Sequence, residues 1–259
     1  MRISTSGIRR IAKSCAVSVL GREARPRTIV RGLASGYRIC VSPAENLGYL
    51  VGTDEPHLQR AIRKFVSAGD TTYDIGANIG YVSLSLAKQV GQKGRVIAFE
   101  PVPRNVDLLR ANVRNNQLQN IQVFDVAASD RQGEAVIRIA DNHSMASLIW
   151  HKNVPSAVEL VIKTVAIDDL VSAGELPAPS FVKIDVEGGE GLVLLGMRGT
   201  ISAAKPVLFI ETSDAGRQTA WSMLSELGYR CQSAITGRPV KSFGDYRHSD
   251  FLWLPSARV

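Results

Sequence analysis

Two patterns of hydrophobic and polar residues take turns along the chain. One is typical of buried strands and the other is typical of helices. Between residues 71 and 126, three short apolar runs are separated by segments whose apolar residues recur every three or four positions. Val82, Leu86 and Val90, for example, share one helical face. The pattern predicts strands at 71–75, 95–100 and 121–126, with a helix after each of the first two.

The same rhythm returns later in the chain after an interruption. Residues 134–140 and 159–167 alternate like antiparallel strands around a polar segment, so we expect an inserted hairpin or lid at about 134–167. Further elements are then expected as strands at 180–185, 205–211 and 249–255 and helices at 190–197 and about 219–227. Alternation of this kind predicts an α/β fold with a doubly wound, mostly parallel sheet covered by helices on both faces.

The N-terminal part is basic and follows a different pattern. Residues 8–20 place apolar side chains at helical spacing with Arg9, Arg10 and Lys13 opposite, which predicts a short amphipathic helix. Residues 1–38 hold nine Lys or Arg and one acid, whereas the remainder holds 22 basic and 23 acidic residues. We expect a basic arm at 1–38 and a single domain at 39–259. The net charge of this domain is close to zero, which argues against binding to the phosphate backbone of a nucleic acid.

Composition is compatible with several functions of the basic arm and with more than one cellular location of the protein. A basic amphipathic helix suits peripheral contact with an anionic membrane surface, but Arg- and Ser-rich residues 1–30 also suit a transit peptide. A helix docked on its own domain is the third alternative. No run of about 18 apolar residues occurs. Three widely spaced cysteines fit reduced thiols and therefore a cytoplasmic protein.

Residues 71–84, TTYDIGANIGYVSL, have the outline of a nucleotide-binding turn. A dinucleotide fingerprint needs glycine where Asn78 stands, since a side chain there would crowd the diphosphate. Asp74 at the strand tip would also repel that anion. A ligand with an ammonium and a carboxylate reverses the argument, because Asp74 could accept the ammonium while the helix N-terminus receives the carboxylate. Gly76 and Gly80 permit close backbone approach.

The end of the second strand adds a ribose to this ligand. Glu100 lies 24 residues after Gly76, where a carboxylate accepts hydrogen bonds from both ribose hydroxyls. Zwitterion, sulfonium and ribose together describe S-adenosylmethionine better than a dinucleotide. Ala127 and Ala128 follow the third strand, and their small side chains would leave room for adenine.

Five stretches resemble the successive motifs of FkbM-type S-adenosylmethionine-dependent methyltransferases. They are YDIGANIGY, VIAFEPVPRNVDLLRANVRNN, AASDRQGEA, KIDVEGGE and PVLFIE. The resemblance covers roughly residues 45–255, with Gly189 standing where the family usually has Ala. It implies a class I methyltransferase (Rossmann-like) fold, a seven-stranded sheet whose last strand is antiparallel. It also implies that Asp74, Gly76, Asn78 and Gly80 hold the methionine end of the cofactor.

For function, the resemblance implies methyl transfer to a hydroxyl on a sugar, glycolipid or natural product. A hydroxyl must lose its proton, and a nearby carboxylate can accept it. Asp185, Glu187 and Glu190 cluster at a strand tip, where like charges raise a pKa or favour a bound cation. We expect Asp185 to be the base or an acceptor ligand, with Glu187 beside it and Glu211 on the neighbouring strand as its partner. A divalent metal bridging these acids is a less favoured alternative.

Two histidines and the missing motifs complete the functional expectations. His143 and His151 lie in the polar insertion and are candidates for substrate contacts. The Asn/Asp-Pro-Pro-aromatic tetrapeptide of base methylases is absent, so an RNA methyltransferase is the less favoured enzyme. A non-catalytic nucleotide-binding module is the other alternative, although acids at three strand ends argue against it. Neither a P-loop nor Gly-x-Ser-x-Gly occurs.

Overall fold

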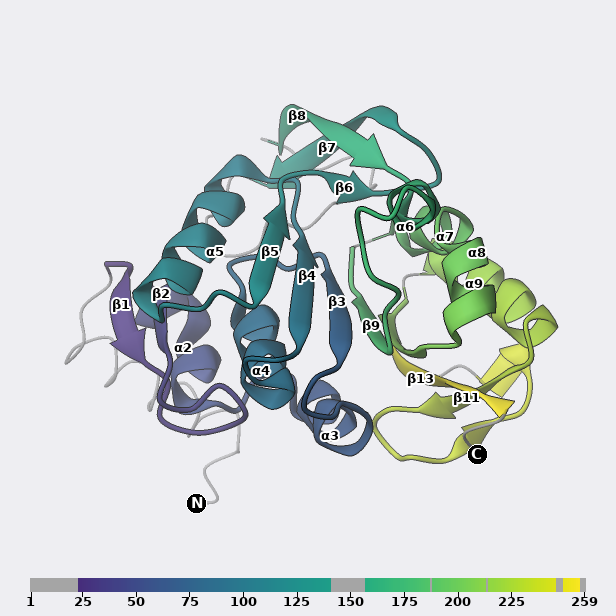
Figure 1. Ribbon diagram of the computed structural model, residues 1–259, viewed down its shortest axis with the longest axis horizontal. Helices are drawn as coiled ribbons and strands as arrows, with labels where there is room; N and C mark the ends of the chain where they lie inside the picture. The colour runs from purple at the N-terminus through teal and green to yellow at the C-terminus, as the bar shows by residue number, and fades with distance from the viewer. Residues whose placement is uncertain (1–22, 141–156, 187, 213, 246–248, 257–259) are drawn as a thin grey trace, which may run out of the picture.

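The computed structural model (Figure 1) describes residues 23–140, 157–186, 188–212, 214–245 and 249–256. The elements of the first half are β1 (Arg25–Thr28), β2 (Arg38–Val41), α2 (Pro43–Val51), α3 (Pro56–Phe65), β3 (Thr71–Ile75), α4 (Tyr81–Val90), β4 (Arg95–Phe99), α5 (Pro103–Asn115), β5 (Ile121–Phe124), β6 (Ala127–Ala128) and β7 (Gly133–Ala140). The second half contains β8 (Ala157–Val165), α6 (Ile167–Ser172), β9 (Phe181–Ile184), α7 (Glu190–Leu195), α8 (Arg198–Ala204), β10 (Val207–Glu211), α9 (Asp214–Glu226), β11 (Tyr229–Ser233), β12 (Pro239–Val240), the 3-10 turn Phe243–Asp245 and β13 (Asp250–Pro255).

The central sheet has the strand order β12-β11-β13-β10-β9-β3-β4-β5. The five strands from β10 to β5 are parallel to their neighbours, whereas β13 is antiparallel to both β10 and β11. The predicted doubly wound, mostly parallel sheet with an antiparallel last strand is therefore confirmed. The count of seven strands rises to eight because the two-residue strand β12 adds to the edge beside β11.

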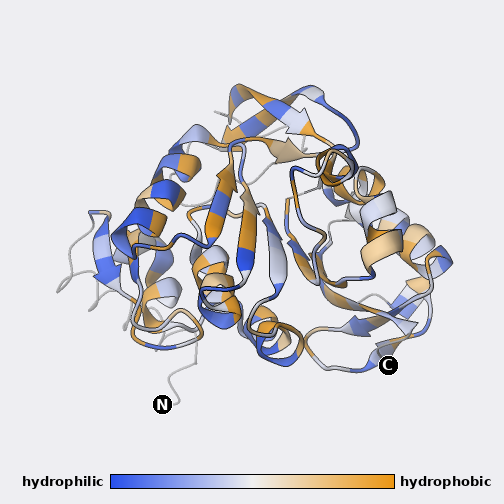
Figure 2. Cartoon of the chain, viewed as in Figure 1, coloured by the Kyte–Doolittle hydropathy of each residue, from blue (hydrophilic) through white to orange (hydrophobic). Residues whose placement is uncertain are grey.

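Each central strand is buried on both faces, as the apolar runs predicted. In β4, Val96 and Ala98 join the core beneath the helices of the first half of the chain, and Ile97 and Phe99 join the core beneath the second half. Figure 2 shows apolar residues concentrated in these strands, while α5 alternates apolar and polar residues around its surface. Two cores on opposite faces give the three-layer architecture of a doubly wound fold.

The strand order reverses between β3 and β9. β4 and β5 extend the sheet on one side of β3, and β9 and β10 extend it on the other. Ligands of open α/β sheets bind beyond the carboxyl ends of the strands at such a switch point. Asp74 of β3 and Lys183 of β9 are paired in register directly across it, so the topology places the chemistry between these two strands.

The predicted inserted hairpin is confirmed as the antiparallel pair β7 and β8, which join β6 in a separate three-stranded sheet. Ile137 and Ile162 form a small core with Val102, at the start of α5. This hairpin lies across the top of the fold in Figure 1. The segment between the two strands, with His143 and His151, lies outside the described residues.

The N-terminal segment joins the domain earlier than predicted. β1 pairs with β2 from Arg25↔Val41 to Thr28↔Arg38, and Ile29 is fully buried in the main core. The boundary expected between residues 38 and 39 therefore falls inside a hairpin. Residues 8–20, expected to form a basic helix, lie outside the described part. None of the helices in that part has the length and apolar character needed to cross a membrane.

Several short elements were not predicted from the sequence pattern. α2, β1, β2 and β11 each have nine residues or fewer, so few periodic positions mark them. In β11, Tyr229, Cys231 and Ser233 are buried and alternate with two more exposed residues, which is a strand signal over only five positions. α9 begins at Asp214, five residues before the expected Thr219.

The packing of Ile29 predicts that the segment before residue 38 stabilises the domain. Ile29→Ala should lower the free energy of unfolding by about 2–5 kcal/mol through lost burial and a residual cavity. Val30, with 64% of its surface exposed, supplies a matched control, and Val30→Ala should change stability by less than about 0.5 kcal/mol. Urea denaturation measures both, and equal small effects would show that this segment is not part of the core.

Candidate active site

A cavity of about 340 Å³ lies beyond the carboxyl ends of the central strands. This volume falls within the range of cofactor and small-molecule sites. Its walls come from the glycine turn after β3, the ends of β4, β9 and β10, the β6–β8 sheet, and the segment before α3. The cavity brings together most of the residues predicted for a site, namely Gly76, Asn78, Glu100, Ala127, Ala128, Asp185 and Glu211.

The turn after β3 has a backbone that few residues other than glycine adopt. Gly76, Asn78 and Gly80 have φ angles of 77°, 51° and 93°, and asparagine tolerates this left-handed region better than most residues. A Cβ on Gly76 would lie 1.8 Å from the carbonyl oxygen of Asp185. The turn therefore packs directly against the end of β9. Gly80 begins α4 outside the cavity lining.

Glu100 is held in place by the same turn. Its carboxylate accepts hydrogen bonds from the backbone N–H of Asn78 at 2.8 Å, the N–H of Val102 at 3.1 Å and the side-chain amide of Asn105 at 3.2 Å. Burial raises the pKa of Glu100, and these three bonds oppose the rise. A carboxylate offers about four lone-pair positions, so one more acceptor position can serve a ligand hydroxyl.

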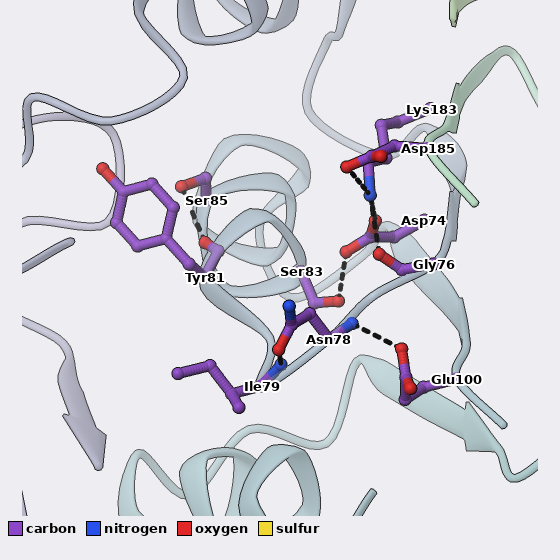
Figure 3. A network of polar contacts seen from close by, with 10 residues as sticks. All are labelled: Asp74, Gly76, Asn78, Ile79, Tyr81, Ser83, Ser85, Glu100, Lys183 and Asp185. Carbon is purple, nitrogen blue, oxygen red and sulfur yellow. Dashed lines mark hydrogen bonds and ion pairs between the residues drawn. The ribbon is translucent and has the colours of Figure 1, made fainter. Parts of the chain in front are cut away.

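Asp74 lies behind the cavity wall instead of lining it. Its side chain is fully buried and accepts a hydrogen bond from Ser83 of α4 at 2.6 Å. Its other oxygen lies 3.4 Å from the Nζ atom of Lys183 (Figure 3). This placement differs from the expected contact with a ligand ammonium. Asp74 instead contacts Lys183, which in turn contacts Asp185 in the cavity lining.

Lys183 links three groups at the switch point. Its Nζ donates to the carbonyl oxygen of Gly76 at 2.7 Å and lies 3.3 Å from the Oδ2 atom of Asp185. Burial alone would lower the pKa of the ammonium, but the carboxylates of Asp185, Asp74 and Glu55 outweigh it and raise the pKa above its ordinary value. Of the acids predicted to cluster at this strand end, Asp185 is thus paired with this lysine.

The acids predicted as catalytic separate into different settings. Asp185 and Glu211 end the neighbouring strands β9 and β10 and face one cavity, as expected from adjacent strand ends. Glu190 is buried and accepts a hydrogen bond from the N–H of Gly188 at 2.7 Å, so it stabilises the loop before α7. Glu187 lies outside the described residues.

Two residues that sequence reasoning missed complete the opposite wall. Tyr49 of α2 stacks on Tyr81 with ring centroids 4.4 Å apart, and Glu55 caps the N-terminus of α3. Burial is the largest cause that raises the pKa of Glu55, to about 7. The position of Glu55 in the cavity depends on tertiary packing, which no local pattern reveals.

The lining fits S-adenosylmethionine in the chemistry of its groups. Glu100 can accept from ribose, the backbone of Gly76 and Asn78 is open to a charged amino-acid end, and Ala127 and Ala128 leave room for a flat ring. In the described ranges, no group of three or more His, Cys, Asp or Glu side chains is arranged to hold a metal ion.

A doubly wound sheet with this antiparallel last strand and this cavity is the class I methyltransferase fold. Residues 74–231 match the family model described as the methyltransferase FkbM domain, and the chain belongs to this family of S-adenosylmethionine-dependent methyltransferases.

Two relatives have names that state part of their reaction, a sugar acid as the acceptor in one and methylation on oxygen in the other. Hexuronic acid methyltransferase AglP of Haloferax volcanii is 29% identical over 172 residues, which cover 66% of this chain and 68% of the relative. The 2-O-methyltransferase NoeI of Sinorhizobium fredii is 28% identical over 155 residues, which cover 54% of this chain and 62% of the relative. The match thus spans less than two thirds of NoeI.

Among solved structures, an FkbM methyltransferase from Methylobacillus flagellatus KT is 20% identical with a TM-score of 0.45. The alignment covers 95% of this chain and 59% of that one.

The links made by Lys183 predict a large and specific stability loss. Lys183→Met should lower the free energy of unfolding by about 3–5 kcal/mol, because it leaves the buried Asp74 carboxylate and the Gly76 carbonyl without their partner. Lys163→Met, at an exposed lysine of β8, is the control and should change stability by less than about 0.5 kcal/mol. Chemical denaturation of both variants tests this, and a similar small loss in each would contradict the assigned role.

Proposed function

We propose that this chain transfers a methyl group from S-adenosylmethionine to a neutral hydroxyl on a sugar, glycolipid or related natural product. The carboxylates of Asp185 and Glu211, which share one cavity with the cofactor-binding candidates, are the observation that carries this proposal. Carboxylates can orient an alcohol and accept its proton, as oxygen methylation requires. The name of the hexuronic acid methyltransferase supports a sugar as the acceptor, and the name of the 2-O-methyltransferase supports methylation on oxygen.

The cofactor supplies an electrophilic methyl on a sulfonium, and the chain supplies position and charge. We assign the methionine end to the backbone of Gly76 and Asn78, the ribose to Glu100, and the adenine to the surface beside Ala127 and Ala128. Asp185 and Glu211 orient the acceptor hydroxyl from the strand ends. Positioning of this kind supplies a large share of the rate in a displacement between two bound groups.

The charge of the cavity favours a neutral acceptor over an anionic one, in contrast to the hexuronic acid in the name of the relative AglP. Asp185, Glu211 and Glu55 all line it, whereas the nearby ammonium of Lys183 is already shared with Asp74 and Asp185. An acceptor carboxylate near these groups would be repelled in a partly buried setting where screening is weak. A hydroxyl carries no such cost and can donate a hydrogen bond to Asp185.

The cofactor assignment predicts selective stabilisation by ligands. S-adenosylmethionine or S-adenosylhomocysteine should raise the melting temperature, and NAD should not, because binding to the folded state alone shifts unfolding. Glu100→Ala should weaken S-adenosylhomocysteine binding by about 1.5–3 kcal/mol through loss of a charged hydrogen-bond acceptor. Calorimetry measures this loss, with Glu175→Ala at an exposed position as the control. Stabilisation by NAD alone would refute the assignment.

The acceptor assignment predicts a preference set by charge. With methyl-labelled cofactor, kcat/KM for a neutral glycoside should exceed that for the matching uronic acid by at least about tenfold, equivalent to about 1.4 kcal/mol. The label should enter an ether, which mass spectrometry identifies. A uronate ester as the preferred product, or methylation of RNA only, would overturn the acceptor class.

A further inference from the structure

Glu55 occupies an unusual place in the cavity wall. It precedes Pro56 at the start of α3, upstream of the strands that form the nucleotide-binding half of the fold. Even so, it lines the same cavity as Asp185 and Glu211. The packing of α3 against β10 brings this helix start to the end of the sheet. Glu55 thus shares this cavity with the acids at the strand ends.

The backbone at Glu55 is strained and firmly held. Its φ and ψ of 53° and 46° lie in the left-handed region, which is costly for a glutamate. Gln59 fixes the approach to this turn, since its buried side-chain amide donates to the carbonyl oxygens of Asp54 at 2.7 Å and Gly52 at 3.3 Å. Strain that the surroundings maintain in this way is typical of functional positions.

Charged and titratable groups surround Glu55 from every element packed nearby. They are Tyr49 on α2, Asp54 in its own loop, Tyr81 on α4, Lys183 and Asp185 at the end of β9, and Asp250 on β13. Burial raises the pKa of Glu55 most, Lys183 lowers it, and Asp185, Asp250 and Asp54 raise it further, to about 7. Both protonation states are therefore populated at neutral pH, which suits proton transfer.

Asp185 already has a cationic partner. Its Oδ2 lies 3.3 Å from the ammonium of Lys183, which also binds Asp74 and the Gly76 carbonyl. Within the described residues, no donor is hydrogen-bonded to the Glu55 carboxylate. The two acids can thus have different roles. Asp185 orients the acceptor, and Glu55 changes its protonation state.

The geometry points to Glu55 as the general base that removes the proton from the acceptor hydroxyl, an inference that rests on the proposed function. The acceptor oxygen forms a bond to the methyl carbon, and the carbon–sulfur bond breaks with its electron pair left on sulfur. The hydroxyl proton goes to the Glu55 carboxylate, which later releases it to water. The products are a methyl ether, S-adenosylhomocysteine and a proton.

The first experiment needs no cofactor or acceptor. An acid whose pKa is raised from 4.5 to about 7 on folding destabilises the folded chain as pH rises through that window, and the whole cost is present above it. Glu55→Gln removes this cost. The variant should melt at a higher temperature than the natural chain at pH 8, and this advantage should be much smaller at pH 5, close to the unfolded pKa of 4.5. Glu175→Gln, at an exposed glutamate, should match the natural chain at both pH values.

The second experiment uses the complete chain with cofactor and a neutral glycoside. Glu55→Gln should lower kcat by about 10²–10⁴-fold and leave S-adenosylhomocysteine affinity unchanged. The natural chain should lose kcat as pH falls below about 7, where Glu55 becomes protonated, and the variant should lack this acidic limb. Asp185→Asn should retain the limb and move it to lower pH, because the Asp185 carboxylate is one of the charges that raise the pKa of Glu55.

The possible outcomes distinguish a wrong assignment of the base from a wrong proposed function. Methyl ether formation at the natural rate by Glu55→Gln, or an acidic limb lost in Asp185→Asn and kept in Glu55→Gln, would overturn the role of Glu55 while the proposed function stands. An equal melting advantage of Glu55→Gln at pH 5 and pH 8 would also overturn it. A chain that methylates no hydroxyl would refute the proposed function and the base role together.

Discussion

The site depends on one buried ammonium. Lys183 extends from β9 and binds Asp74, Asp185 and the carbonyl oxygen of Gly76, and so joins the two strands that meet at the switch point. Burying a charge costs several kcal/mol unless it is paired and hydrogen-bonded. Here both conditions are met, with distances of 2.7–3.4 Å. The arrangement also offsets part of the negative charge at the strand ends, where an acceptor and a cationic cofactor would have to meet.

The glycine turn extends this link to the cofactor side. Gly76 can approach the Asp185 carbonyl closely only because it has no Cβ, and the left-handed conformation of Asn78 turns its N–H toward Glu100. One short segment thus connects Lys183 on one side to Glu100 on the other, as Figure 3 shows. A change at either end is transmitted through backbone hydrogen bonds and not only through side chains.

The sequence predicted the order of the long elements from two signals. Continuous apolar runs mark the strands that are buried on both faces, and apolar residues every three or four positions mark the helices between them. It also placed Glu100, Asp185 and Glu211 at strand ends, and parallel topology then brought them to one cavity. Lys183 is a charged residue inside the otherwise apolar strand Phe181–Ile184. Its ion pairs with Asp74 and Asp185 depend on strand pairing, which the sequence pattern alone does not give. Asp74 was predicted to contact the ligand because strand ends look alike in sequence, whereas burial depth is a property of packing. Glu55 could not be found at all, since α3 reaches the cavity only through its contact with the sheet.

The central claim is that the cofactor spans the cavity from Ala127 and Ala128 to the acids at the ends of β9 and β10. A crystal structure of the chain with S-adenosylhomocysteine tests it most directly. A ribose hydroxyl should lie within hydrogen-bond distance of Glu100, with the amino-acid end against Gly76 and Asn78 and the sulfur facing the side of Asp185 and Glu55. A product bound outside this cavity, or bound with its ribose away from Glu100, would contradict the account.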